Sequence, residues 1–474
     1  MFRVKCLQIG IKRGFTQVVV IDLFSFYCIE YMNLKLAYSL MITGAILCLP
    51  ACKKDPVVEK RKQTSTSSSD NNSGENNGQQ PSSPDKDAVL TRIEVVNPPV
   101  QTTYLLRSEV SVNLEGLVVE GIYSNGERKK LDITSESLSG FSTEKAIEQL
   151  PVIITVEEKQ TSFMVKVIDY VINNGVLTEV LEKQGEVYRV PAEAKVISPT
   201  AFAASTFDKI ILSEGVEEIQ ADAFTGNSVK EVVFPKSLKT LGEYCFYGCR
   251  NLSRVDLSDT QVQIIPKRAF SEVGAEEIKL PVTLREISSQ AFLHTDRLHS
   301  MTFPEDLKTI GVEAFRESGV ESVTLPNNLN LLEERAFYLC QNLCEVRSSG
   351  NGSRETAGVI KGGVFQYCPK LTLIEFPESI ESIGQTLFSG VVNLDAITLG
   401  KNLKKMAFNA LGNSTVKLLT VKTATPPSLQ TYALPQQVDR VSVPKGTLEL
   451  FRQPLGNVSL RSSWGILATK MEEF

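Results

Sequence analysis

Cysteine and histidine are the side chains that could bring nucleophilic, redox or metal chemistry to this chain. It contains nine cysteines but only two histidines, His294 and His299. The histidines are five residues apart and belong to no HExxH motif, and the CxxxC spacings at 245/249 and 340/344 match no zinc pattern. We therefore expect two solvated histidines in a turn and no metal site.

The remaining side chains form no catalytic constellation either. The sequence has no GxGxxG, Walker or GxSxG motif, and its aspartates and glutamates are scattered as on a solvated surface. Its formal net charge of -5 is unlike that of a nucleic-acid-binding protein. The sequence therefore predicts a non-enzymatic protein with no cofactor and no nucleic-acid partner.

Ten phenylalanines recur at intervals of 20 to 28 residues and define the elements that must position every other side chain. Most follow an alanine, and apolar triplets ending in proline, such as 323–326, lie between them. A period of this size predicts stacked turns, each with a short strand and a helical or 3₁₀ corner that buries its phenylalanine. The predicted ladder consists of Phe202, Phe224, Phe246, Phe270, Phe292, Phe315, Phe337, Phe365, Phe388 and Phe408.

Three cysteines keep a constant place in this repeat. Cys249, Cys340 and Cys368 each follow a ladder phenylalanine by three residues. This spacing predicts an interior column in which the thiols pack as small apolar groups. A disulfide between Cys340 and Cys368, in adjacent turns, is the alternative in an oxidising compartment.

The repeat resembles the BspA-like leucine-rich repeats, whose units read approximately L-x-x-I-x-L-P-x-S-L-x-x-I-G-x-x-A-F. Residues 298–315 are among the closest copies, and the resemblance covers about residues 170–425. Pro426, Pro427 and Trp464 are similar to the closing segment of such arrays. The resemblance implies a solenoid at 169–425, a cap at 426–474, and a surface-exposed protein associated with adhesion or protein binding.

An apolar run from Leu36 to Leu49 is followed by Pro50, Ala51 and Cys52. The run is too short to span a bilayer and predicts a secretory signal at 32–51 that starts at Met32. It resembles a bacterial lipoprotein signal, in which Cys52 would be the acylated first residue. On this interpretation residues 1–31 are a mis-annotated upstream extension. Residues 52–87, rich in serine and asparagine, then form a flexible tether.

Residues 88–168 change to the period-two pattern of β-strands. Strands are predicted at 93–96, 110–114, 117–123, 152–156 and 163–167, with a hairpin turn at Asn125-Gly126. This order resembles the bacterial immunoglobulin-like modules that act as spacers in surface proteins. The predicted fold class is mainly β: a small immunoglobulin-like β-sandwich followed by a leucine-rich repeat solenoid.

Two parts of the array are candidate binding surfaces. The outward strand positions form columns whose middle is small and polar, although an ordinary solvated sheet has the same pattern. The 28-residue gap between Phe337 and Phe365 predicts an inserted loop, and inserted loops often determine specificity. The candidate contact residues are Ser300, Thr302, Ser322 and Thr324 on the strands, and Arg347, Asn351, Arg354 and Glu355 in the loop.

These features predict a lipid-anchored, monomeric binding or adhesion protein outside the cytoplasm. We expect it in the outer membrane, facing the cell surface or the periplasm, with a protein or glycan as its partner. An envelope scaffold and a carbohydrate-binding accessory lipoprotein of a glycan uptake system are the alternatives. Exposed aromatic side chains would favour a glycan, and the outward strand columns contain none.

Overall fold

The computed structural model of the chain describes residues 88–350, 357–391, 393–453 and 463–474. The predicted lipidation site Cys52, the signal, the tether and the upstream extension lie outside the described residues. Within the ranges described, no helix is both long enough and apolar enough to cross a membrane.

The first described part, residues 90–168, consists of two small sheets around a core of its own. Its buried side chains include Ile93, Tyr104 and Phe163. The predicted hairpin is confirmed: Gly126 adopts a φ of 83°, and its amide donates to the Tyr123 carbonyl. One sheet has the order β1 (Leu90–Asn97), β3 (Val118–Tyr123), β4 (Arg128–Leu131); the other has the order β2 (Thr103–Leu105), β7 (Lys159–Ile168), β6 (Ile147–Val156), β5 (Leu138–Ser139).

One predicted strand of this part is wrong. Residues 110–114 are irregular rather than extended in a sheet. The amide of Asn113 donates to the hydroxyl of Tyr104 at 3.0 Å, so a side chain takes the place of a neighbouring strand. The β character of the part agrees with the sequence pattern, whereas its likeness to immunoglobulin modules stays a prediction.

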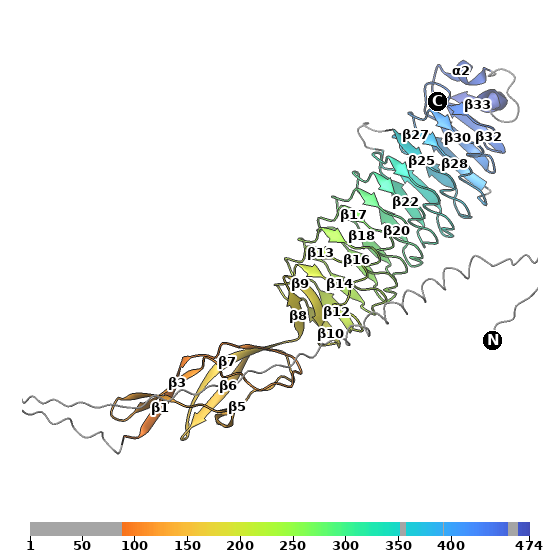
Figure 1. Cartoon of the computed structure of the whole chain (residues 1–474). Helices are drawn as coiled ribbons and strands as arrows, with labels where there is room; N and C mark the ends of the chain where they lie inside the picture. The colour runs from red at the N-terminus through yellow and green to blue at the C-terminus, as the bar shows by residue number, and fades with distance from the viewer. Residues whose placement is uncertain (1–87, 351–356, 392, 454–462) are drawn as a thin grey trace, which may run out of the picture. The chain divides into compact units, whose positions relative to one another are not determined.

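The array is a stack of turns. Each turn contributes one pair of strands, and these run parallel to the strands of the neighbouring turns (Figure 1). We call the sheet of longer strands the front sheet. It consists of one block of five hydrogen-bonded strands and one of eight, which follow one another along the stack. Its members are β10 (Gln184–Arg189), β12 (Thr206–Ile211), β14 (Glu231–Val233), β16 (Arg254–Asp256), β18 (Glu277–Lys279), then β20 (Ser300–Thr302), β22 (Ser322–Leu325), β24 (Glu345–Ser348), β26 (Leu373–Glu375), β28 (Asn393–Leu399), β30 (Thr415–Val421), β32 (Gln437–Val443) and β33 (Met471–Glu473).

The second sheet, which we call the back sheet, is built from the shorter strand of each turn. In most of these strands the first residue faces outward and the second is buried, as in Ile264 and Ile265. Its members are β8 (Tyr170–Asn173), β9 (Val176–Val180), β11 (Val196–Ile197), β13 (Glu218–Ile219), β15 (Thr240–Leu241), then β17 (Ile264–Ile265), β19 (Glu286–Ile287), β21 (Thr309–Ile310), β23 (Leu331–Leu332), β25 (Gly358–Ile360), β27 (Ile380–Ile383), β29 (Lys405–Met406) and β31 (Ser428–Leu429).

The segment that carries the ladder phenylalanine, which we call the Phe corner, is a turn and not the predicted helix or 3₁₀ helix. Residues two before and two after the phenylalanine adopt positive φ, as Arg268 and Glu272 do around Phe270. Alternating backbone handedness points the amides toward the next turn, where a helix would direct them within its own turn. The Phe246 amide thus donates to the Ala269 carbonyl at 2.9 Å, and the same bond recurs along the stack.

The phenylalanine ladder is confirmed for nine of its ten predicted members. From Phe202 to Phe388 the rings are buried and stacked, with centroids 4.8 to 6.0 Å apart and interplanar angles of 4° to 22°. Phe408 is the exception, since 47% of it is exposed. Asn409 takes the positive-φ position there, so that Leu411 occupies the interior place of the ladder.

The solenoid extends beyond its predicted end at residue 425. Strands β31 and β32 pair in register with the preceding turn, so the last turn reaches Val443. The closing segment then contains helix α2 (Leu448–Arg452), the 3₁₀ helix η3 (Trp464–Lys470) and β33. Trp464 is buried against Phe451, and its indole N–H donates to the Pro427 carbonyl at 2.9 Å. This segment covers the apolar end of the stack, as predicted for Trp464.

Candidate binding surfaces

The front sheet places the predicted strand residues in two parallel columns. Ser300 pairs with Ser322 and Thr302 with Thr324, while Met301 and Val323 between them are buried. The two β20 side chains are exposed and the two β22 side chains are half-buried. The four residues therefore form one small, polar, solvent-facing patch in the middle of the sheet.

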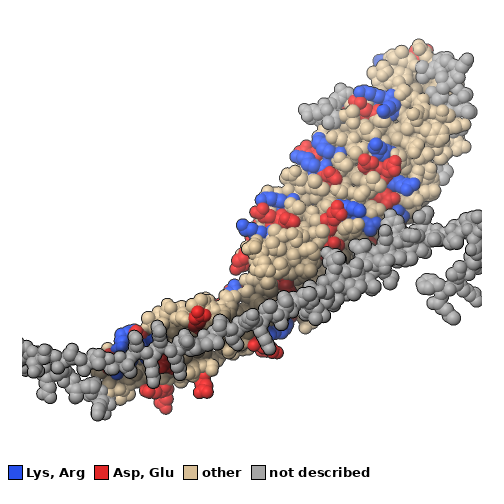
Figure 2. All heavy atoms as spheres, viewed as in Figure 1, with Lys and Arg blue, Asp and Glu red and all other residues tan. Residues whose placement is uncertain are grey.

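Charged side chains flank this patch and are paired with one another. Arg254 bridges Asp256 at 3.0 Å and Glu277 at 3.1 Å on one side, and Lys422 bridges Glu375 at 3.2 Å on the other. On the side of the molecule shown in Figure 2, basic and acidic residues of the array are interspersed and not collected by sign. The front sheet therefore has no strong field of either sign to attract a highly charged partner.

The inserted loop leaves the front sheet after β24. Arg347 on that strand is exposed and pairs with Glu345 at 2.8 Å, whereas Asn351, Arg354 and Glu355 lie outside the described residues. The corner ladder continues past the insertion, because the Phe337 amide donates to the Val364 carbonyl at 3.0 Å. The extra residues are thus accommodated between β24 and β25 without interrupting the stack.

The cysteine column lies inside the array, as predicted. Cys249, Cys340 and Cys368 are buried, and each thiol donates to the carbonyl of the ladder phenylalanine one turn earlier, at 3.0 to 3.1 Å. Burial raises the pKa of Cys249 to about 12 and that of Cys368 well above its ordinary value. Cys340 and Cys368 are separate thiols in this structure, and Cys344 is the exposed cysteine among those described.

The two histidines have separate acidic neighbours. The Nδ1 atom of His294 lies 3.4 Å from Glu317, and that of His299 lies 3.3 Å from Glu321. Among the described residues, no group of three or more histidine, cysteine, aspartate or glutamate side chains is placed to hold a metal ion.

The Phe corners differ in length, and this difference hollows the surface. The buried apolar residue two positions before each front-sheet strand follows Phe270 and Phe315 by five residues (Ala275 and Val320), but follows Phe246, Phe292 and Phe337 by six (Leu252, Leu298 and Leu343). Each shorter corner therefore lies between two longer ones and leaves a depression in the row. The chain approaches closely there: a Cβ added to Gly274 would lie 2.0 Å from the Arg250 carbonyl oxygen, and one added to Gly319 would lie 2.1 Å from that of Asp296.

We call the two depressions the Gly274 notch and the Gly319 notch. The Gly274 notch has a volume of about 490 Å³ and is lined by Arg250, Glu272, His294 and Asp296, among others. The Gly319 notch, of about 260 Å³, is lined by Asp296, Glu317, Leu339, Gln341 and Asn342, among others. Asp296 lines both. No hydrogen bond or ion pair with another described residue engages its exposed carboxylate.

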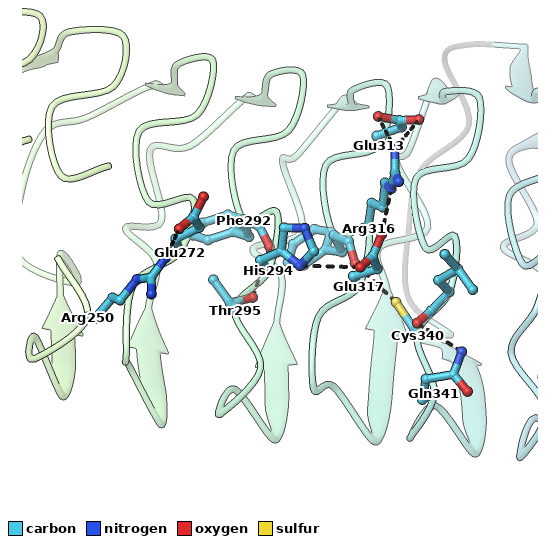
Figure 3. Close-up of polar contacts among 12 residues, drawn as sticks. Arg250, Glu272, Phe292, His294, Thr295, Glu313, Arg316, Glu317, Cys340 and Gln341 are labelled. Carbon is cyan, nitrogen blue, oxygen red and sulfur yellow. Dashed lines mark hydrogen bonds and ion pairs between the residues drawn. The ribbon is translucent and has the colours of Figure 1, made fainter. Parts of the chain in front are cut away.

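The polar side chains around the Gly274 notch are held in place by one another. Arg250 and the Tyr247 hydroxyl both donate to the Glu272 carboxylate, and Figure 3 shows Glu272, His294 and Glu317 on successive corners. Burial alone would raise the pKa of Glu272, but the hydrogen bonds from Arg250 and Tyr247 outweigh it and keep this pKa below its ordinary value. The carboxylate is therefore charged and fixed in position at neutral pH.

Aromatic side chains lie on the same Phe corners, whereas the outward columns of the front sheet contain none. Tyr367 is 47% exposed, and its ring lies over Gly390, since a Cβ added there would be 2.6 Å from the ring. Tyr338 packs edge-on against Tyr367 with ring centroids 5.6 Å apart. The guanidinium groups of Arg316 and Arg335 each lie 5.5 Å from the Tyr338 centroid.

This surface was not predicted from the sequence. Its signal was present as the alternation of five- and six-residue spacings after successive phenylalanines. A one-residue difference looks like ordinary variation until the turns are stacked and the shorter corner is seen between two longer ones.

The comparisons with known proteins agree with this architecture. The family model described as a BspA type leucine-rich repeat region matches residues 195–274, 263–356 and 358–461, more than half of the chain. The chain belongs to this family. No curated protein matches it significantly.

Solved structures similar to this leucine-rich repeat protein come from several bacteria. A leucine-rich repeat protein from Bacteroides ovatus is 18% identical, with a TM-score of 0.39, and the match covers 68% of this chain and 90% of that one. The pneumococcal vaccine antigen PcpA is 17% identical, with a TM-score of 0.33, over 69% and 95% of the two chains. A leucine-rich repeat protein from T. pallidum is 24% identical, with a TM-score of 0.27, over 46% and 78% of the two chains.

Proposed function

We propose that this leucine-rich repeat protein is a non-enzymatic binding or adhesion protein, anchored outside the cytoplasm by a lipid on Cys52. It presents its front sheet to a protein or glycan partner and acts as a monomer at the outer membrane, facing the cell surface. Membership of the BspA type family supports the binding role, and the sequence of the signal supports the anchor.

The front sheet carries this proposal. Its parallel strands are about 4.8 Å apart, so the twelve from β10 to β32 make a face roughly 50 Å long. Its inward side chains are buried while its outward ones stay in solvent. Its charged side chains form ion pairs with near neighbours, so a partner does not have to carry an excess of the opposite charge. Such a face suits recognition over a large area more than capture of one small molecule.

Membrane attachment tests the anchor. Cys52→Ala should remove incorporation of labelled palmitate and release the full chain from the membrane fraction. Cys48→Ala, four residues earlier within the signal, is the matched control and should leave both unchanged. Labelling that persists in the Cys52 variant would contradict the anchor, and protection of the chain from protease added to intact cells would contradict its exposure.

Adhesion tests the front sheet. Cells that produce the full chain should adhere to surfaces coated with basement-membrane extract or with mucin, and Ser300→Lys with Thr302→Lys should abolish this by placing two charges in the polar patch. Thr240→Lys with Ser428→Lys, at exposed positions of the back sheet, is the matched control. Equal adhesion by both double variants would refute binding through the front sheet.

A further inference from the structure

We propose that the Phe corners from Phe270 to Phe365 form a second binding site, a groove for an extended neutral polysaccharide. We call it the corner groove: the Gly274 notch, the Gly319 notch and the Tyr367 platform. It uses a surface other than the front sheet, and it requires of the proposed function only that the chain meets glycans outside the cytoplasm.

Equal spacing of its three parts is the first argument. Glu272, Glu317 and Tyr367 each lie two residues after a ladder phenylalanine, on corners that are successively two turns apart. Two turns correspond to about 10 Å along the stack. The corner groove therefore offers equivalent positions at a regular interval over about 20 Å, which suits a polymer with a repeating unit better than a single small molecule.

The chemistry of the lining is the second argument. Sugar hydroxyls both donate and accept hydrogen bonds; the Gly274 notch presents carboxylates and guanidinium groups, and the Gly319 notch presents carboxylates and amides. The Asp296 carboxylate faces both notches without a hydrogen bond or ion pair to any described residue. Gln341 donates to the Tyr367 carbonyl at 3.3 Å, which joins the Gly319 notch to the aromatic platform.

Tyr367 supplies the third argument. The C–H face of a pyranose ring packs on the π face of an aromatic side chain, which carries partial negative charge. Gly390 leaves room for the Tyr367 ring beside the next corner, and the Tyr338 ring packs against it at a right angle. An exposed aromatic ring held in this way is pre-ordered, so little side-chain entropy is lost when a sugar stacks on it.

Charge balance favours a neutral glycan. At the Gly274 notch Arg250 pairs with Glu272, and Arg297 pairs with Glu276 outside the lining. The Gly319 notch has two carboxylates and no lysine or arginine in its lining; Glu317 is paired with the neighbouring Arg316 at 3.0 Å, and Asp296 has no ion-pair partner among the described residues. An anionic polysaccharide would be repelled from that notch, and a neutral one would not.

Affinity electrophoresis of the full chain tests the corner groove. The probes are soluble neutral polysaccharides (mixed-linkage β-glucan, xyloglucan and galactomannan), with hyaluronan as the anionic comparison. At least one neutral polysaccharide should retard the protein and hyaluronan should not. Tyr367→Ala and Asp296→Ala should each raise the dissociation constant about tenfold or more. Hexasaccharides should bind more tightly than disaccharides of the same sugar, because only the longer ligand reaches two parts of the groove.

Phe408→Ala is the matched control, because Phe408 has the same exposed fraction as Tyr367, 47%, but lies outside the groove. It should leave the retardation unchanged, as should Ser300→Lys with Thr302→Lys on the front sheet. No retardation by any neutral polysaccharide, stronger binding of hyaluronan, or equal loss in the Phe408 variant would overturn the proposal. Loss only in the front-sheet variant would overturn the corner groove while leaving the proposed function intact.

Discussion

The front sheet and the Phe corners belong to the same turns, yet they differ in how strictly they repeat. On the front sheet from β14 to β26, each turn contributes a strand of three or four residues in register, and the charges are paired with neighbours. On the corners, the length changes by one residue between turns, which produces two notches, and a tyrosine lies two turns beyond the second of them. The regular repeat of the turns therefore forms the surface, and the turns that depart from the repeat make one part of this surface different from another.

Loss of a ladder ring should give the largest effect, because it breaks the interior of the corners. Phe292→Ala should lower the free energy of unfolding by about 3–5 kcal/mol, since it opens a cavity between Phe270 and Phe315. Phe408→Ala should cost less, about 1 kcal/mol, because nearly half of that residue is exposed to solvent. Denaturant unfolding of both variants measures the difference in stability. Equal losses would contradict the finding that Phe408 lies outside the buried ladder.

Thiol labelling separates the interior of the corners from their surface. In the folded protein Cys344 should react with iodoacetamide about a hundredfold faster, or more, than Cys249, Cys340 and Cys368, because Cys344 is exposed and the other three are buried. Burial also raises the pKa of Cys249 and Cys368 and so disfavours their thiolates. Mass spectrometry of peptides gives the rates. Labelling of Cys340 and Cys368 after unfolding without reductant would exclude a disulfide between them, and failure to label both would establish one.

The close approach at the notches predicts an intermediate effect. Gly319→Ala should destabilise the fold by about 2 kcal/mol, because its Cβ would meet the Asp296 carbonyl oxygen. Gly226→Ala is the matched control: it also lies on a Phe corner, with a φ of 68° and no atom within 4 Å of the added Cβ. It should cost about 1 kcal/mol, for backbone strain alone. Thermal unfolding compares them, and a smaller loss at Gly319 would show that the corner is not tightly packed there.

The carboxylate at the Gly274 notch predicts the smallest effect. The pKa of Glu272 is lower in the folded protein, so its stabilising contribution is present above the unfolded-state pKa and is lost as pH falls through the folded-state pKa. Glu272→Gln should therefore cost about 0.5 kcal/mol at pH 7 and almost nothing at pH 3. Melting temperatures of the two proteins at both pH values test this. A difference that persists at pH 3 would assign the loss to packing.

Much of the interior could be predicted from the sequence. The phenylalanine period and the cysteines three residues later identify buried columns, since a side chain that recurs once per turn must meet its own copy in the next turn. The exception at Phe408 had a signal, because the gap of 20 residues before it is the shortest of all. Leu411, 23 residues after Phe388, keeps the usual spacing.

Of the two candidate surfaces, the front sheet could be predicted from the sequence and the surface of the Phe corners could not. The outward columns follow from the alternation of side chains along a strand, so the polar patch at Ser300 and Thr302 was placed correctly on the front sheet. The corner backbone was predicted as helical because a short apolar segment with alanine has no feature that excludes a helix. The positive φ of residues such as Arg268 arises instead from hydrogen bonds to the next turn, which local propensity does not contain.

By itself the sequence determined that the chain stacks, which phenylalanines and cysteines lie inside, and where the repeat is interrupted. These follow from one-dimensional periodicity and from the cost of leaving apolar side chains in water. Only the tertiary structure decided that Asp296 belongs to two notches, that the Tyr367 ring lies against Gly390, and that Leu411 replaces Phe408 in the ladder. Each depends on the offset between neighbouring turns, and that offset exists only once the turns are packed against one another.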